Sequence, residues 1–192
     1  MAGTDKQLKN RELLLLVADA AGGTLDGRTI AQKLLYFSGV ALKQPTGHTP
    51  YFYGPYSDEF EAALNRSVLA GELDERVERI PDWYGGPDAT KHVYSLTESG
   101  RAAAKLIAAE NRGAASKVKK TVVAIGSVVP EFRQKTLSAA AKIHLIVSEQ
   151  HRALTTDELR RLAKDLGWRL KQEEVTEAIN VLASLKLVSL GS

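Results

Sequence analysis

The chain has 192 residues, of which 44% are hydrophobic and 26% charged, and it contains no cysteine. This composition is typical of a folded protein and excludes disulfides, iron–sulfur clusters and thiol nucleophiles. No apolar run approaches the roughly 20 residues of a membrane span, and residues 1–10 lack the apolar core of a signal peptide, so we expect a cytoplasmic protein that does not enter a membrane.

Charge is divided unevenly along the chain. Residues 1–112 hold 13 Lys and Arg against 15 Asp and Glu, whereas residues 113–192 hold 13 against 8. The basic surplus therefore lies in the second half. Such a surplus indicates either a surface for nucleic acid or lysines that are simply solvated on helices.

The first half predicts three helices, because apolar residues recur at helical spacing over residues 8–21, 30–42 and 58–70. In the second of these helices Ile30, Leu34 and Phe37 lie on the apolar stripe, and Lys33 and Tyr36 lie off it. The side chains predicted to share one core are Leu16, Leu34, Phe37, Phe60 and Leu64.

Between the second and third helices lies the heptapeptide YFYGPYS, residues 51–57, which we call the elbow. Pro55 fixes its own φ and disfavours helix at Gly54, so the segment is predicted to be rigid. Ser57 is a natural N-cap for the third helix, where Asp58 and Glu59 suit the helix dipole. The alternative reading is a turn at the edge of the core in which the tyrosines only fill space.

After the third helix the pattern changes from helix to strand. Residues 73–80 and 92–96 predict a β-hairpin with an irregular, turn-rich tip at 81–88, and Thr97 then caps a further helix. Three helices followed by a hairpin is the element order of a winged helix.

The second half predicts four more helices, over residues 114–129, 137–150, 155–166 and 171–185. Pro130 ends the first of them, Thr155 and Glu158 spell a capping box, and residues 187–190 read as a short strand. The predicted fold is therefore mainly α with small β-hairpin wings. Two winged-helix-like (helix-turn-helix) modules, 1–112 and 137–192, are joined by a basic helical linker, 113–136.

Two motifs in the first module carry a family resemblance. GRTIAQKLLYF at 27–37 and YFYGPYSDEF at 51–60 resemble the signatures of the YwgA-like family and, more loosely, those of Panacea (SocA-type) antitoxin domains, over residues 8–105. The resemblance implies a site that binds a protein partner, and an aromatic elbow is the kind of surface that anchors one. The family pattern falls on Gln32, Lys33, Tyr36, Tyr53, Gly54, Pro55, Tyr56 and Ser57.

The choice of a DNA-binding module depends on charge. A recognition helix presents its first residues to phosphates, so the acidic start of the third helix, SDEFE at 57–61, is a poor candidate. The second module and the linker offer a better one, although Glu173, Glu174 and Glu177 dilute its charge. The candidate DNA-binding residues are Lys117, Lys119, Lys120, Arg160, Arg161, Lys164, Arg169, Lys171, Gln172 and Thr176.

Catalytic chemistry has little support in the sequence. The four histidines, His48, His92, His144 and His151, lack metal-ligand spacing, and Ser57 has no histidine placed to activate it. We therefore expect no enzyme activity, metal or other cofactor. The predicted function is a regulator that binds duplex DNA through its basic second half. The alternative is a protein-interaction module, an antitoxin or phage-defence component, that binds a protein partner or a second copy of itself through the elbow.

Overall fold

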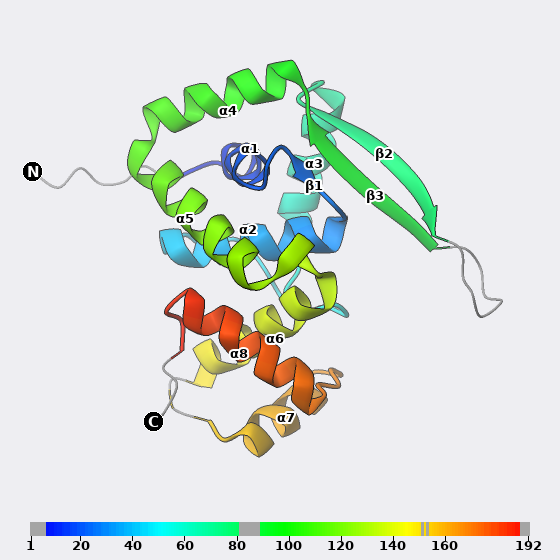
Figure 1. The fold of residues 1–192 in the computed structure, drawn as a ribbon, viewed down its shortest axis with the longest axis vertical. Helices are drawn as coiled ribbons and strands as arrows, with labels where there is room; N and C mark the ends of the chain where they lie inside the picture. Colours follow the sequence, from blue (N-terminus) through cyan, green and yellow to red (C-terminus); the bar gives the residue numbers. More distant parts are fainter. Residues whose placement is uncertain (1–6, 81–88, 151, 153, 189–192) are drawn as a thin grey trace, which may run out of the picture.

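The structure is a computed structural model that describes residues 7–80, 89–150, 152 and 154–188. The described part is mainly helical, with a small antiparallel sheet. In Figure 1 helices α1 to α5 form the upper part of the molecule and α6 to α8 the lower part, while the hairpin β2–β3 projects to one side. The predicted combination of many helices with a small sheet is confirmed.

The three helices predicted in the first half are present. They are α1 (Asn10–Ala20), α2 (Arg28–Leu42) and α3 (Asp58–Leu69), with the two-residue strand β1 (Thr24–Leu25) between α1 and α2. Ser57 caps α3 as predicted, because its hydroxyl accepts a hydrogen bond from the Phe60 amide at 3.4 Å.

The hairpin is also present. Strand β2 (Leu73–Ile80) pairs antiparallel with β3 (Ala89–Leu96), which begins three residues earlier than predicted, and β1 pairs with the other edge of β3. The sheet order is β1-β3-β2. The predicted irregular tip at 81–88 lies outside the described residues. Thr97 caps the next helix by accepting from the Gly100 amide at 3.1 Å.

The remaining elements of the described chain are all helices. They are α4 (Glu98–Glu110), α5 (Arg112–Val128), the short 3-10 turn η1 (Pro130–Phe132), α6 (Gln134–Gln150), α7 (Thr156–Asp165) and α8 (Gln172–Ser184). The capping box of α7 is confirmed, with Thr155 N donating to Glu158 at 2.9 Å and Glu158 N donating to Thr155 at 3.2 Å. The strand predicted at 187–190 does not form at 187–188, and its last two residues lie outside the described chain.

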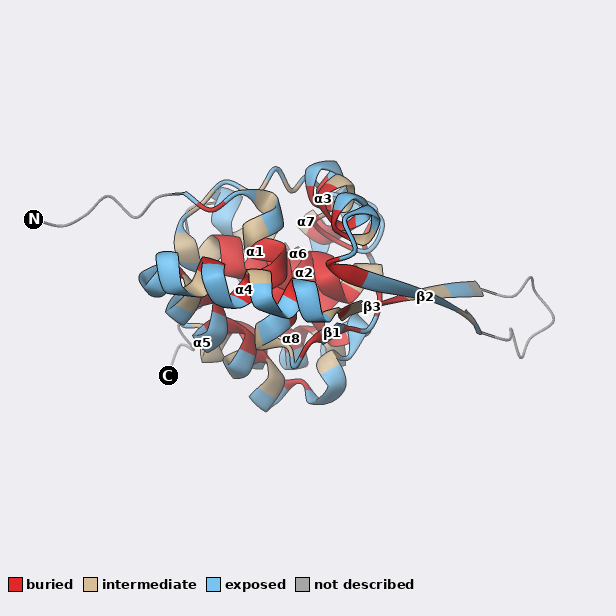
Figure 2. Cartoon of the chain, turned by 90° about the horizontal axis from the view of Figure 1, so that it is seen from above, coloured by how far each residue is buried: buried red, intermediate tan, exposed pale blue. Residues whose placement is uncertain are grey.

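One continuous hydrophobic core runs from α1 to α8. All five side chains predicted to share a core belong to it, and Figure 2 shows the buried positions concentrated on α1, α2 and the surfaces facing them. Helix α5 packs against α1, α2 and α8, so the segment predicted as a linker contributes Val118, Val122 and Ile125 to the same core.

Helix α2 is buried on more sides than its apolar stripe predicted. Lys33 and Tyr36, expected off the apolar stripe, are only 1% and 5% exposed. The reason is that α2 is the central helix and contacts α1, α3, α5 and α6 on its different sides (Figure 1). A helix covered on most sides has no solvent face for polar residues, so these two polar groups must find partners inside the protein.

Candidate functional site

The elbow is a tight turn in the loop between α2 and α3. Thr49 and Tyr56 exchange two backbone hydrogen bonds of 2.9 Å, and the Gly54 amide donates to the Tyr51 carbonyl at 2.9 Å. Gly54 has φ +96°, in the region that favours glycine over every other residue. The predicted rigid elbow therefore has a closed backbone with a glycine at its corner.

Helix α2 holds the elbow from inside. The Gln32 carboxamide donates to the Ser57 carbonyl at 3.0 Å and accepts from the Ser57 amide at 3.1 Å. The Lys33 ammonium donates to the Pro55 carbonyl at 2.7 Å. Because Gln32 and Lys33 are both buried, these two residues act as supports for the elbow and have no surface for an external partner.

The outer side of the elbow docks on the second half of the chain. Trp168 Nε1, between α7 and α8, donates to the Tyr51 carbonyl at 2.8 Å. A Cβ at Gly54 would lie 3.3 Å from the Ser138 carbonyl oxygen of α6, so the two backbones are in close approach. Tyr36 adds a hydrogen bond of 2.7 Å between its hydroxyl and His144 Nδ1 of α6. The elbow therefore joins the two halves of the protein.

This docking separates the residues predicted to bind a partner into buried and exposed ones. Tyr53 is 51% exposed, and the Tyr56 hydroxyl is half-buried and donates to Glu61 at 2.5 Å. The remaining six are buried: Gln32, Lys33, Tyr36, Gly54, Pro55 and Ser57.

Two exposed aromatic residues were missed by the family pattern. Tyr51 is 60% exposed and Phe52 is 73% exposed, and the Phe52 ring meets the Tyr53 ring edge-on at 4.9 Å. We call Tyr51, Phe52 and Tyr53 the aromatic cluster. Three successive aromatic residues before a Gly-Pro pair were the sequence signal that could have identified it.

Lys33 is electrostatically unusual. Within the part of the chain that the structure describes, it makes no ion pair with a carboxylate, and its one hydrogen bond is to a neutral carbonyl. Burial, together with the charge of Lys142, lowers the pKa of Lys33 to about 7. Burial, with the Lys33 charge, also lowers the pKa of His48 to about 4.

This lowered pKa predicts a pH dependence of stability. The unfolded chain holds the Lys33 proton up to about pH 10.5, whereas the folded chain releases it near pH 7, so the cost of burying the cation fades as the pH rises through that window. Relative to a Lys33→Met variant, the wild type is expected to gain up to about 1.4 kcal/mol per pH unit above pH 7. Urea unfolding at several pH values measures this difference.

A matched control is Lys105→Met, which removes an exposed lysine of α4. Its stability difference from the wild type is expected to be independent of pH over the same range. If Lys33→Met gave an equally flat difference, the Lys33 amine would already be solvated in the folded protein.

A second polar cluster lies between α2, α3 and the hairpin, and the sequence did not predict it. Arg28 Nε donates to the Tyr94 hydroxyl at 2.8 Å, and that hydroxyl donates to Glu75 at 2.9 Å. His92 lies 2.7 Å from the same carboxylate, and Arg28 lies 3.5 Å from Glu61. Burial alone would raise the pKa of Glu75, but the hydrogen bonds from His92 and Tyr94 outweigh it and hold that pKa below its ordinary value.

The described cavity beside this cluster is too small for a substrate. The cavity beside it, lined by Arg28, Tyr56 and Glu61 among others, has a volume of about 10 Å³, roughly that of one water probe. The contacts of Arg28 instead link the hairpin to α2, and α2 to α3. The motif residue Arg28 therefore has a structural role that the spacing alone did not reveal.

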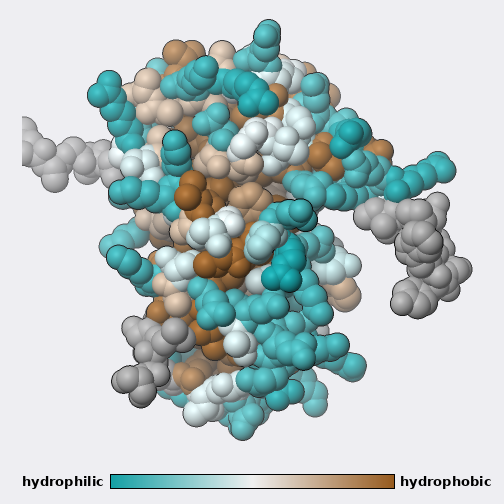
Figure 3. Space-filling view, viewed as in Figure 1, coloured by the Kyte–Doolittle hydropathy of each residue, from teal (hydrophilic) through white to brown (hydrophobic). Residues whose placement is uncertain are grey.

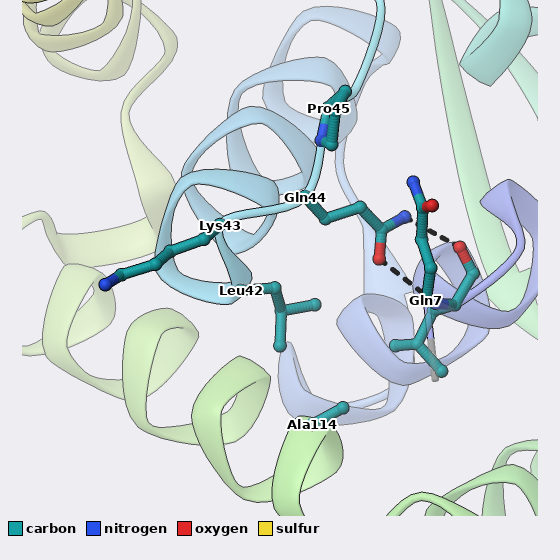
Figure 4. A pocket seen from close by; sticks show the side chains of 7 residues that line it. Gln7, Leu42, Lys43, Gln44, Pro45 and Ala114 are labelled. Carbon is teal, nitrogen blue, oxygen red and sulfur yellow. Dashed lines mark hydrogen bonds between the residues drawn. The ribbon is translucent and has the colours of Figure 1, made fainter. Parts of the chain in front are cut away.

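A larger cavity near the start of α1 is bridged by a side chain of the protein itself. Its volume is about 160 Å³, and in Figure 4 the Gln44 side chain reaches across it. Gln44 accepts from the Leu8 amide at 3.1 Å and donates to the Leu8 carbonyl at 2.7 Å, while Lys43 points away from the cavity. Both ends of the carboxamide are thus used to tie the segment before α1 to the loop after α2.

The ten predicted DNA-binding residues are all exposed. They do not form one surface. Lys117, Lys119 and Lys120 lie in the first half of α5, which begins beside the end of α4, whereas α8 begins at the lower right of Figure 1. The other seven lie on α7, on the turn after it and at the start of α8. We call these seven the α7–α8 surface, and Figure 3 shows hydrophilic residues gathered over that part of the molecule.

The acidic residues at the start of α8 are partly neutralised within the protein. Glu174 pairs with Lys135 at 3.1 Å, and Glu177 lies 3.8 Å from Arg133 and accepts from the Thr136 hydroxyl at 2.6 Å. These partners come from the region around the start of α6. Their charge offsets two of the three acids that dilute the α7–α8 surface.

No protein-family model matches this chain, and a search of curated proteins gives no match either. Among the described residues, no helix is both long and apolar enough to cross a bilayer. Those residues also contain no cluster of three or more side chains suited to hold a metal ion.

Proposed function

We propose that the protein is a DNA-binding regulator that contacts duplex DNA through the α7–α8 surface. The observation that carries this proposal is the exposure of five cations, Arg160, Arg161, Lys164, Arg169 and Lys171, around one helix–turn–helix. In DNA-binding helix–turn–helix motifs the second helix presents its first turn to the major groove, while the first helix crosses the DNA backbone. In this proposal Gln172 and Thr176, which are exposed on the first turns of α8, contact base edges.

The first half supports the same class of protein. Its element order is helix, strand, two helices and a hairpin, and the order β1-β3-β2 brings the short first strand against the hairpin. These features favour the winged-helix interpretation of residues 1–112. The start of α3 carries Asp58, Glu59 and Glu61, so in this proposal that module does not read DNA.

The salt dependence of binding tests the proposal. The logarithm of affinity for duplex DNA is expected to fall linearly with the logarithm of salt concentration, and each phosphate contact removed should flatten the slope by about 1. The double variant Arg169→Gln with Lys171→Gln is expected to flatten it by about 2, and fluorescence anisotropy with a labelled duplex measures both slopes. Lys105→Gln, at an exposed position of α4, is the control and should leave the slope unchanged.

Two further variants locate the contacts. Replacing Lys117, Lys119 and Lys120 by Gln is expected to change the slope less than the double variant, because they lie on another surface. Gln172→Ala is expected to relax discrimination between sequences with little effect on the slope. A purified protein without salt-sensitive DNA binding at low ionic strength would remove the regulator proposal.

The aromatic cluster favours a second candidate function, capture of a protein partner. Large aromatic side chains that are more than half exposed on a fixed loop are typical anchors of protein interfaces. Here Phe52→Ala and Tyr53→Ala are expected to abolish a capture that the wild type shows, with the unfolding midpoint unchanged. Such an interface should respond to salt less steeply than DNA binding does. Tyr56→Ala is a poor probe, since its hydroxyl bond to Glu61 is part of the fold.

A further inference from the structure

The outer edge of strand β2 is unpaired within the described chain, because the sheet order is β1-β3-β2 and β3 lies on the other side of β2. The hairpin projects away from the helices (Figure 1 and Figure 2). An edge strand of eight residues offers a row of backbone N–H and C=O groups to another strand. In the middle of this edge lies Val77, an apolar residue that is 54% exposed.

The hydrogen bonds at the base of the sheet show which backbone groups of β2 face outward. Leu96 of β3 donates to the carbonyl of Gly23, just before β1, at 2.8 Å, so its backbone groups point away from its β2 partner Leu73. The register of β2 and β3 is continuous, and the direction of the backbone groups alternates along an antiparallel pair. The odd-numbered residues of β2, with Val77 among them, therefore turn their N–H and C=O groups to the free edge.

Charge selects one pairing of this edge with a second copy of itself. In an antiparallel pair with Val77 opposite the partner's Val77, Glu75 faces Arg79 of the partner. Arg76 then faces Glu78 of the partner, so every charged pair from 75 to 79 is of opposite sign. Moving the centre of the pairing by one residue sets Arg76 opposite Arg76, or Glu78 opposite Glu78. The register about Val77 also brings outward-facing backbone groups together.

The charges that would face one another are accessible in the single chain. Arg76 and Glu78 form an ion pair of 2.6 Å along the strand, with side chains 74% and 37% exposed. Arg79 pairs with no carboxylate among the described residues. Exposed charge pairs add little to affinity, but like charges directly opposite one another are unfavourable. These residues therefore determine the partner and the register, whereas the backbone hydrogen bonds and the two Val77 side chains supply the attraction.

We propose that β2 pairs with β2 of a second copy of the chain, antiparallel and in register about Val77. The two small sheets then form one continuous sheet across a two-fold axis, with the same edge contributed by both copies. Because each copy contributes a single short strand, the buried area is small and the dimer is expected to be weak. This association does not depend on the proposed contact with DNA.

Sedimentation equilibrium of the full chain tests the inference. The average mass is expected to rise from monomer toward dimer with concentration, up to about 1 mM, where a dimer with a Kd of about 1 mM is half-formed. Val77→Pro is expected to weaken association about tenfold or more, because it removes an outward N–H. Proline is tolerated at such an edge position, so the circular dichroism should not change. A wild type that stays monomeric throughout the series would overturn the inference.

Two charge variants then test the register. Arg76→Glu and Glu78→Arg each set like charges opposite one another, so each alone is expected to associate about tenfold more weakly than the wild type. An equal mixture of the two is expected to recover the association of the wild type, because the carboxylates of one copy then face the guanidinium groups of the other. Either variant associating as strongly as the wild type, or a mixture no heavier than its components, would overturn the inference, whether or not Val77→Pro folds.

Discussion

Replacing Phe60 by alanine is expected to lower the free energy of unfolding by about 3 to 5 kcal/mol. Phe60 is completely buried at the start of α3, where its ring lies 5.5 Å from the ring of His48. Truncation removes the apolar area of the ring and leaves a cavity in the core. Urea unfolding followed by circular dichroism measures the loss.

Phe52→Ala is the matched control, since it makes the same chemical change at a side chain that is 73% exposed. Its free energy of unfolding is expected to stay within about 0.5 kcal/mol of the wild type. A loss below about 1 kcal/mol for Phe60→Ala would contradict the position of Phe60 in the core.

The second large effect is expected for Gly54→Val, which should cost about 3 kcal/mol of stability. A β-branched residue is strained at φ +96°, and its Cβ would lie 3.1 Å from Lys142 Cγ and 3.3 Å from the Ser138 carbonyl oxygen. The variant must therefore either strain the elbow or push it away from α6. Urea unfolding again gives the magnitude.

Gly22→Val separates the two causes. Gly22 has a similar φ of +87°, but a Cβ there would meet nothing within 4 Å. It should show the backbone strain alone, about 1 to 2 kcal/mol. Equal losses at the two glycines would mean that the elbow does not depend on its close approach to α6.

Local features of this fold could be predicted from the sequence because their causes are local. The Ser57 cap and the capping box of Thr155 and Glu158 each depend on a few neighbouring residues. The exposure of the basic residues of α7 also has a local cause. Their side chains lie on the faces that the apolar stripes leave to solvent.

The features that were not predicted depend on contacts between distant parts of the chain. Lys33 and Tyr36 are buried because α6, whose His144 is 108 residues from Tyr36, covers that side of α2. The contacts of the elbow with the second half of the chain were not predicted for the same reason. Its carbonyl at Tyr51 is bonded by Trp168, 117 residues later, and no periodicity in the sequence reports such a pairing.

The bond between Trp168 and Tyr51 has a practical consequence. The chain contains two tryptophans. Trp168 is only 3% exposed, the Lys142 ammonium lies over its ring, and its Nε1 donates to the Tyr51 carbonyl of the elbow. Its emission therefore acts as a built-in optical reporter of whether the two halves are in contact. In a Trp83→Phe background, a red shift of that emission would follow separation of the elbow from α6 and α8 in real time, without any attached dye.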